Sequence, residues 1–427
     1  MMSRRFVLVL LVLAIAAAFV GAQSKTISFL SIWPETVDNA KLILDLTKDY
    51  QATHAGFQVD FELVDTNSLQ QKVKVLLASD DLPDVFCYES GAPILELIAA
   101  NKVVNVETAF KDLGIFDYLD PGAVSLLKRL ASNKGLYDLP LGMNVEGIWY
   151  HKKDFAAAGI SAPPKTWDEL LADCAKLQAK GIQPFTAGGK DKWPISRVLN
   201  MYVMRRLGVD AMQNAVDGKL SFTDPRFIEA ARAVQDMAKK GYFGTGITTV
   251  DYGAAADTLL SGKAAMLYNG SWFAENLNDP KRNLAGPDGI GFFNIPLVKG
   301  GVGTMDDYSV NCGTILCLSR KKYDAGMADW VKYVFTRLGD KAMTDYGALK
   351  GYKVTTTNAN LSGYTKLIQA ELKKVKNAGL WFEASFDSKT SQVAQDDIQS
   401  LFMGSMTPEQ YWKDIDQANK EYQASKQ

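Results

Sequence analysis

The sequence predicts an α/β fold divided into two lobes, and three observations support this. From residue 26 onward, short β-rich runs alternate with stretches whose apolar residues recur at helical spacing. Helix-capping signals and glycine-rich turns continue this alternation along the later part of the chain. The chain has 427 residues. A chain of this length is usually too long for a single hydrophobic core, so we expect two domains.

The first elements are three strands with two helices between them. Residues 26–32 form a β-rich run, residues 58–64 alternate apolar and polar side chains, and residues 83–88 form a third strand-like run. Between them, apolar side chains recur at helical spacing over 42–50 and 69–77. The order β-α-β-α-β predicts a parallel sheet covered by helices.

Later helices are marked by their ends. Thr166, with a glutamate three residues further on, has the pattern of a capping box at a helix start. We expect Gly241 to end a helix over 227–240 and Gly339 to end a helix over 325–338, because glycine is favoured just past a helix C-terminus.

The charges of the side chains nearly cancel, with 47 Lys and Arg against 48 Asp and Glu. This balance gives no reason to expect nucleic acid or an anionic membrane as a partner. It suits a neutral ligand.

The N-terminus has the pattern of a cleaved export signal. Arg4 and Arg5 precede an uninterrupted apolar run over 6–20, and small residues then lead to Ala22. We expect cleavage after Ala22, so that residues 1–22 form a signal peptide. The run is short for a membrane span, and no cysteine lies near the cleavage point for a lipid anchor. A retained anchor is the alternative.

Few groups are suited to catalysis or metal binding. The chain has two histidines, His54 and His151, and we expect both at the surface. We expect no catalytic residue, no metal and no cofactor. A glycosidase needs only two carboxylates, so that class stays open. Whether any cysteines pair also stays open, although small buried thiols are the favoured interpretation of Cys87, Cys174, Cys312 and Cys317.

Seven strings, in this order, resemble the family 1 extracellular solute-binding proteins, the sugar-binding subunits of ABC importers related to maltose-binding protein. The resemblance covers nearly the whole chain after the signal, and it rests on the order and spacing of the strings together. The strings are LASDDLPDV (77–85), KGLYDLP (134–140), IWYHKKDF (148–155), PPKTWDEL (163–170), FTDP (222–225), GKAAM (262–266) and GSW (270–272).

The resemblance implies a periplasmic-binding-protein-like fold, with two α/β lobes, a hinge and a ligand cleft between the lobes. We expect the N-terminal lobe to comprise 24–140 plus 308–347, and the C-terminal lobe 141–307 plus 348–427. The chain would pass between the lobes near 139–145, 304–311 and 347–355.

The resemblance also implies a function: a monomeric periplasmic receptor that captures a mono- or oligosaccharide and delivers it to the membrane permease of an ABC importer. Two other classes stay open, a secreted carbohydrate-active enzyme and a receptor of the same fold that feeds a sensor or chemotaxis protein. The sequence does not give the sugar, its length or its linkage.

In the first lobe, candidate ligand-binding residues follow the strand ends, where open parallel sheets bind ligands. Trp33 and Glu35 follow the first strand, Asn67 the second, and Tyr88 and Glu89 the third. Aromatic rings can stack on the apolar faces of a sugar, and the polar groups can bind its hydroxyls. A core position is the alternative for both aromatic residues.

In the second lobe, Asp191 and Trp193 follow a Gly-Gly turn, and Asn269 follows a strand over 264–268. The resemblance implies that Trp272 contacts the sugar and that a stacking aromatic lies near Trp381.

Residues beside the expected crossings complete the candidate site: Asn144 and Glu146 beside the first crossing, and Asp307 and Tyr308 beside the second. Four further tryptophans lie within strand or helix patterns, and we expect these in the core: Trp149, Trp167, Trp330 and Trp412. The main candidate ligand-binding residues are Trp33, Glu35, Asn67, Tyr88, Glu89, Asn144, Asp191, Trp193, Asn269, Trp272, Asp307, Tyr308 and Trp381.

Overall fold

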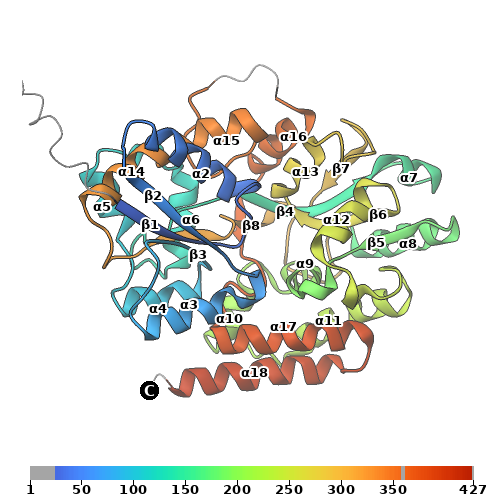
Figure 1. Cartoon of the computed structure of the whole chain (residues 1–427). Coiled ribbons are helices and arrows are strands. Elements are labelled where there is room, and N and C mark those ends of the chain that lie inside the picture. The colour runs from blue at the N-terminus through green and yellow to red at the C-terminus, as the bar shows by residue number, and fades with distance from the viewer. Residues whose placement is uncertain (1–24, 357–360, 426–427) are drawn as a thin grey trace, which may run out of the picture.

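The computed structural model describes residues 25–356 and 361–425, and the expected signal peptide lies outside these residues. Two lobes, each with its own sheet, lie side by side (Figure 1). The smaller sheet is on the left of this view and the larger one is at the centre and right. This confirms the two-lobed α/β architecture.

The smaller sheet has the strand order β2-β1-β3-β9. β1 runs parallel to both β2 and β3, as the β-α-β-α-β pattern predicts, and β9 joins β3 in antiparallel fashion from far along the chain. The strands are β1 (Lys25–Ser31), β2 (Phe57–Leu63), β3 (Val85–Tyr88) and β9 (Ile315–Leu318).

The larger sheet has the order β10-β8-β4-β6-β5, with β7 also paired to β4. β4 is its central strand and pairs in antiparallel fashion with β6, β7 and β8. The strands are β4 (Asn144–His151), β5 (Gln183–Thr186), β6 (Ala264–Gly270), β7 (Ile290–Phe293), β8 (Asp307–Asn311) and β10 (Asn377–Gly379).

The chain passes between the lobes beside these strands. Leu139 pairs with Leu316 of the smaller sheet, and Asn144 begins β4 of the larger one, so the first passage lies within the expected segment. The second passage falls at 312–314 rather than at 304–311, because β8 stays in the larger sheet. Residues 308–311 therefore pair with the second lobe, whereas the expected division gave them to the first; the rest of that division stays a prediction.

Helices pack around three clusters of buried apolar residues. The first cluster takes residues from α2 (Asp38–Gln51), α3 (Leu69–Ala78), α4 (Ala92–Ala99), α5 (Val106–Asp112), α6 (Pro121–Leu130), α14 (Ala325–Phe335) and α15 (Leu338–Tyr346). The second takes residues from α7 (Lys152–Ala157), α8 (Trp167–Ala179), α9 (Trp193–Leu207), α10 (Ala211–Val216), α11 (Pro225–Lys239), α17 (Ser388–Met403) and α18 (Pro408–Ser425). The third takes residues from α12 (Tyr252–Leu260), α13 (Ala274–Asn278) and α16 (Gly363–Leu372). Short 3-10 turns complete the fold: η1 (Thr66–Ser68), η2 (Phe116–Tyr118), η3 (Gly189–Asp191), η4 (Ile247–Thr249) and η5 (Ser271–Phe273).

Two of the three predicted helix ends are confirmed. Thr166 and Glu169 form the capping box of α8, and Gly241 follows the end of α11 with a φ of 75°. The prediction for Gly339 is wrong, because this residue lies inside α15. A Cβ on Gly339 would lie 2.3 Å from the carbonyl oxygen of Lys353. A glycine is therefore required because the segment at Lys353 comes so close, and not because a helix ends here.

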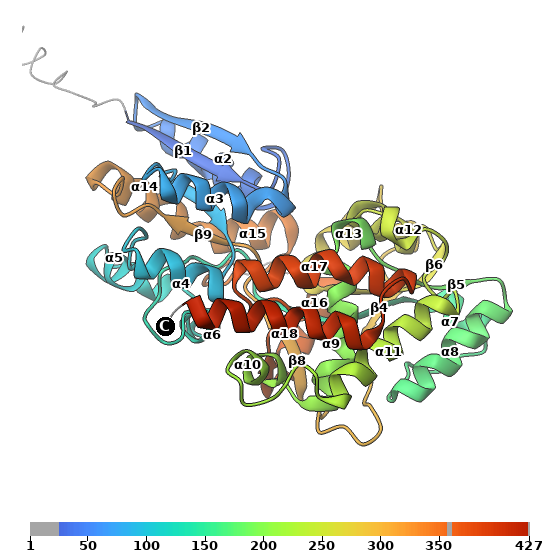
Figure 2. The same cartoon turned by 90° about the horizontal axis from the view of Figure 1, so that it is seen from below.

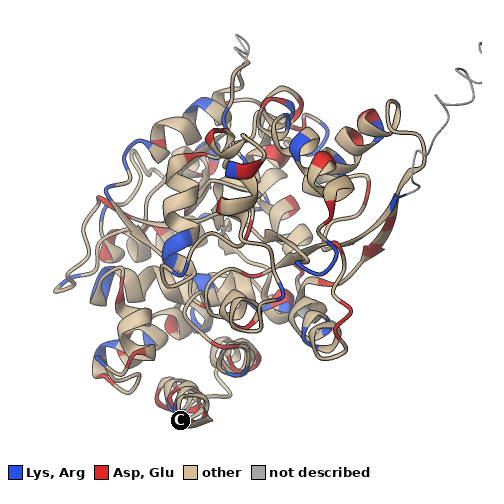
Figure 3. Cartoon of the chain, turned by 90° about the vertical axis from the view of Figure 1, so that its left-hand side faces the viewer, with Lys and Arg blue, Asp and Glu red and all other residues tan. Residues whose placement is uncertain are grey.

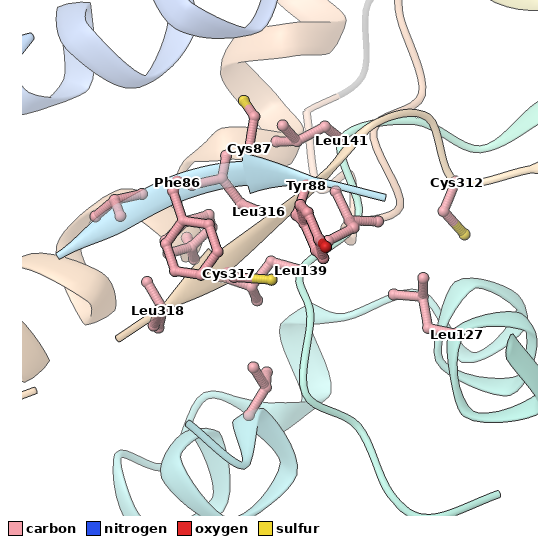
Figure 4. Packing of buried hydrophobic residues seen from close by; sticks show 14 of the residues in the cluster. Phe86, Cys87, Tyr88, Leu127, Leu139, Leu141, Cys312, Leu316, Cys317 and Leu318 are labelled. Carbon is pink, nitrogen blue, oxygen red and sulfur yellow. The ribbon is translucent and has the colours of Figure 1, made fainter. Parts of the chain in front are cut away.

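The core holds the residues expected there, with one correction. All four cysteines are buried as free thiols, and Figure 4 shows Cys87 and Cys317 among the apolar side chains of the first cluster. His151 was expected at the surface, but it is 7% exposed, because the turn at Gly262 packs against its ring. The four tryptophans expected in the core are buried: Trp149, Trp167, Trp330 and Trp412.

Acidic and basic residues are interspersed over the elements in Figure 3, in keeping with the near-zero net charge. Among the described residues, no helix combines the length and the apolar character needed to cross a membrane.

One carboxyl group is buried beside the first passage between the lobes. Asp138 is 0% exposed, and its carboxylate oxygens have no hydrogen-bond partner on another described residue. Burial raises the pKa of Asp138 from its ordinary value of 3.8 to about 7, because the ionised form is poorly solvated there. Asp138 therefore stays largely protonated below neutral pH in the folded protein.

We predict that Asp138→Asn raises the free energy of unfolding at pH 8. Between about pH 4 and pH 7 the folded protein keeps a proton that the unfolded chain has released, so the stability of the wild type falls as pH rises through this window. The gain from Asp138→Asn at pH 8 should be on the order of 3 kcal/mol and should vanish near pH 4. Urea unfolding at several pH values measures it, with Asp117→Asn at an exposed position of the same lobe as control. A gain that does not change with pH would contradict the prediction.

Candidate ligand-binding site

A cavity of about 1340 Å³ opens between the two lobes. The first lobe contributes Trp33 after β1 and Glu89 after β3, and the second contributes Trp193 at the start of α9, Trp272 in η5 and Trp381 before α17. Residues of α3 on one side and of α12, α13 and α17 on the other also line it; Figure 2 shows these helices around the middle of the molecule. Since both lobes supply walls, a bound molecule would touch both.

Seven of the candidate residues line this cavity, although they come from distant parts of the chain. Their role in binding stays a prediction, but the structure brings them together. They are Trp33, Glu89, Asn144, Asp191, Trp193, Trp272 and Trp381.

Two other candidates in the first lobe, Tyr88 and Glu35, do not line the cavity. Tyr88 is 1% exposed and packs in the first core cluster, beside Leu139 and Leu316 (Figure 4). The physical reason is that β3 is buried on both faces between β1 and β9, so the strand end begins to face the cavity only at Glu89. Glu35 is exposed outside the cavity. Asn67 lies in η1, and its side chain is outside the described part of the structure.

Three candidates of the second lobe are buried in its interior instead. Asn269 donates to the Tyr252 hydroxyl over 3.0 Å. Asp307 accepts from the backbone N–H of Thr304 over 2.8 Å, and Tyr308 donates to Glu371 over 3.0 Å. Asp307 and Tyr308 belong to β8, which is paired on both sides, so their side chains serve the packing of the sheet and its loops.

Three tryptophans surround one arginine in the second lobe, and we call Trp193, Trp272, Trp381 and Arg197 the tryptophan cluster. The Arg197 guanidinium carbon lies 5.1 Å from the ring centre of Trp193 and 5.9 Å from those of Trp272 and Trp381. These distances are within cation–π range. Tyr252 lies 5.2 Å from Trp193, centre to centre, and its hydroxyl accepts from Trp272 Nε1 over 2.9 Å.

The backbone at Gly270 is shaped for the ring of Trp272. A Cβ on Gly270 would lie 1.8 Å from the ring, so only glycine lets the indole lie against the chain at the end of β6. The position of Asp191 is also fixed locally, because its carboxylate accepts the backbone N–H of Tyr252 over 2.6 Å.

A buried ion pair holds the arginine of the cluster. Glu146 is 0% exposed and forms a salt bridge with Arg197. Its carboxylate also accepts from Tyr268 over 3.1 Å and from Asn311 over 2.7 Å, so the buried charge is well satisfied. Asn144 donates to Asn311 over 3.1 Å, which extends this network to the first residue of β4.

Two further carboxyl groups face the same arginine. Burial raises the pKa of Glu89 to about 7; the Arg197 guanidinium opposes this effect and Glu383 adds to it. Burial likewise raises the pKa of Glu383, which accepts a hydrogen bond from the Ser196 hydroxyl. Burial alone would lower the pKa of Arg197, but the surrounding carboxylates, Glu146 first, outweigh burial and raise it.

This arrangement suits a ligand with apolar C–H faces and a rim of hydroxyl groups. Aromatic rings can stack on the faces, while carboxylates, amides and a guanidinium bind hydroxyls from the sides. Among the described residues, no cluster of three or more His, Cys, Asp or Glu could hold a metal ion.

Sequence reasoning missed several residues of this site. Arg197 lies four residues after Trp193, the spacing that places two side chains on one face of a helix, so that spacing is a usable signal. Tyr252, Ser271 and Asn311 line the cavity without any comparable signal. Their positions depend on contacts between distant segments.

Comparison with known proteins places the chain in one family. The family described as bacterial extracellular solute-binding protein matches residues 33–315. The chain is 27% identical to the multiple sugar-binding protein of Streptococcus mutans over 353 residues, 77% of this chain and 78% of the relative. It is 34% identical to the sn-glycerol-3-phosphate-binding periplasmic protein of Yersinia pseudotuberculosis over 168 residues, 37% of each chain. A solved structure of a chitin oligosaccharide binding protein superposes with a TM-score of 0.83 at 25% identity, covering 93% of this chain and 98% of the other.

We predict that Gly270→Ala displaces the Trp272 ring. The added methyl group would overlap the indole, so the hydrogen bond to Tyr252 should break and the free energy of unfolding should fall by about 1–3 kcal/mol. Urea unfolding measures the loss, and near-UV circular dichroism reports the tryptophan environment.

Gly253→Ala is the matched control for this substitution. Gly253 lies in α12 near the same site, and the nearest atom to its added Cβ would be 3.5 Å away. Alanine favours a helix over glycine, so this variant should be as stable as the wild type or slightly more stable. Equal stability of the two variants, with unchanged circular dichroism, would refute the packing argument.

Proposed function

The chain belongs to the bacterial extracellular solute-binding proteins, and we propose from this premise that it captures a carbohydrate between its lobes and delivers it to the permease of an ABC importer. The observation that carries the proposal is the interlobe cavity, in which Trp193, Trp272 and Trp381 lie beside carboxylate and amide groups. Flat rings with polar groups at their edges match the alternating apolar faces and hydroxyls of a sugar.

The size of the cavity favours an oligosaccharide over a single sugar. Its volume of about 1340 Å³ exceeds the roughly 300–1,000 Å³ of ordinary small-molecule pockets. Tryptophans on separate segments also offer more than one stacking surface. The name of one similar protein, for chitin oligosaccharides, supports the same choice.

Capture would depend on contacts from both lobes. Trp33 and Glu89 come from one lobe, and the tryptophan cluster comes from the other. A ligand that touches both stabilises a closed arrangement by the difference between its affinities for the closed and open forms. In this proposal the permease recognises the closed form, and the protein performs no chemistry on the sugar.

The proposal includes the location and state of the mature protein. The signal peptide over 1–22 would be removed after Ala22, and no cysteine near that point offers a lipid anchor. The mature chain would then act as a monomer in the periplasm.

A thermal-shift screen of the mature protein, residues 23–427, tests the proposal. The panel comprises mono- and oligosaccharides, amino acids and polyamines, since a ligand of the native state raises the melting temperature. A shift with an oligosaccharide that is recovered unaltered would support the receptor function. Consumption of the sugar would favour an enzyme, and a shift only with another class would overturn the carbohydrate assignment.

We predict that Trp272→Ala weakens binding of the sugar found in the screen by about 1–3 kcal/mol without unfolding the protein, because it removes one stacking surface. Isothermal titration calorimetry on the folded variant measures the change. Trp272→Phe is the control: it keeps an aromatic face but loses the donor to Tyr252, so its loss should be smaller. Unchanged affinity of Trp272→Ala would remove Trp272 from the site.

A further inference from the structure

Two acidic side chains from opposite lobes meet in the cavity without a cation of their own. Glu89 follows β3 of the first lobe, and Glu383 follows β10 of the second. Neither carboxylate forms a salt bridge within 25–356 and 361–425, the residues that the structure describes. Both act electrostatically on Arg197, whose salt bridge is with a third carboxylate, Glu146.

The cations that line the cavity are already paired. Arg282 lies 2.6 Å from Asp257, and Lys350 lies 2.6 Å from Glu275. The lining cations and their partners are Lys74 with Glu96, Arg197 with Glu146, Arg282 with Asp257, Lys350 with Glu275 and Lys389 with Glu421. A negatively charged ligand would therefore find no unpaired cation among these residues.

The surroundings of Arg197 in the tryptophan cluster add to this shortage of unpaired positive charge. Arg197 is enclosed by aromatic rings, and three carboxylates, Glu146, Glu383 and Glu89, act on its single positive charge. The raised pKa values of Glu89 and Glu383 follow from the same surroundings, in which burial disfavours further negative charge. The part of the cavity around Arg197 thus offers more carboxylate acceptors than the single arginine can neutralise.

We propose that the cavity selects its ligand by charge, accepting uncharged saccharides and rejecting acidic ones such as uronates and sugar phosphates, and that Glu89 and Glu383 impose this choice. The inference rests on the proposed carbohydrate function and narrows it. A hydroxyl group donates to a carboxylate, whereas an anion beside the two carboxylates meets repulsion and loses its water without gaining a counter-charge. Family membership does not decide this point, because one of the relatives above is named for a phosphate ester.

The rejection should depend on pH. Glu89 is about half protonated near pH 7, so repulsion of an anion strengthens as pH rises and Glu89 ionises. The other charged or titratable groups that interact with Glu89, Glu383 or Arg197 come from several elements. They are Arg197 on α9, Glu383 before α17, Glu146 and Tyr268 on β4 and β6, Cys87 and Tyr88 at the end of β3, and Tyr411 on α18. Of these, Glu383 adds to the repulsion and Arg197 weakens it.

The test compares neutral saccharides with acidic counterparts by calorimetry on the mature protein at pH 6, 7 and 8. The probes are cellotetraose, maltotetraose, raffinose and tetra-N-acetylchitotetraose, each beside a derivative with one primary hydroxyl oxidised to a carboxylate. The measured quantity is the affinity ratio, the affinity for the neutral form divided by that for the acidic form. For a probe that binds, we expect this ratio to be at least about 100-fold at pH 8 and smaller at pH 6.

The variants assign this selection to the two carboxylates. Glu89→Gln combined with Glu383→Gln keeps side-chain acceptors but removes both charges, so the ratio at pH 8 should fall below about 10-fold and lose its pH dependence. Glu89→Gln alone serves if the double variant is unstable in thermal unfolding, and it should lower the ratio in part. Asp117→Asn, which also removes one carboxylate charge but lies at an exposed position outside the cavity lining, should leave this affinity ratio unchanged.

The outcomes separate this inference from the proposed function. Equal binding of neutral and acidic forms at pH 8, or binding of acidic forms alone, would overturn charge selection while keeping a carbohydrate ligand. A ratio that persists in both glutamine variants would remove Glu89 and Glu383 from the selection. Failure of every saccharide to bind would overturn the proposed function and this inference with it.

Discussion

The buried ion pair between Glu146 and Arg197 is the interaction on which the candidate site depends. Glu146 lies on the central strand of the larger sheet, and Arg197 lies on the helix that carries Trp193. Removing water from both charges is expensive, and breaking such a pair from one side leaves an uncompensated charge that costs roughly 3–5 kcal/mol. The pair therefore fixes the arginine, and with it the centre around which three tryptophans are arranged.

The partners of that pair connect the site to the passages between the lobes. Asn311, the last residue of β8, donates to Glu146 over 2.7 Å and accepts from the backbone N–H of Gly313 over 2.8 Å. Asn144, where the other passage enters β4, bonds to both Asn311 and Ser271. A rotation of the lobes about these passages would thus act on the same hydrogen bonds that hold Arg197. In the proposed receptor, these short hydrogen bonds would connect a ligand at the tryptophan cluster to a movement of the lobes.

Local signals in the sequence were sufficient for some features and insufficient for others. The first three strands and the capping box at Thr166 follow from patterns within a few residues, and the structure contains them. The prediction for Trp272 came from the family resemblance, and Trp272 lines the cavity. The prediction for Tyr88 failed because β3 is buried on both faces as far as its last residue, and only the pairing with β9, from far along the chain, decides where β3 stops being core. The prediction that Gly339 ends a helix failed because the residue that approaches it closely, Lys353, belongs to a later segment of the chain. Arg197 was missed for a similar reason: its partner Glu146 precedes it by a separation of 51 residues.

The buried acids of this protein differ in what could offset their energetic cost. Asp138 has no hydrogen-bond partner on another described residue and does not line the cavity, so its burial lowers stability above neutral pH whether or not a ligand is bound. Glu89 and Glu383 are also unfavourably buried, but they line the cavity. Hydroxyl groups of a bound sugar would donate to them and recover part of the solvation that folding removed. The cost at these two positions then favours the ligand-bound form over the empty one, which is the physical basis for placing poorly solvated carboxylates in a binding cavity and not in the core.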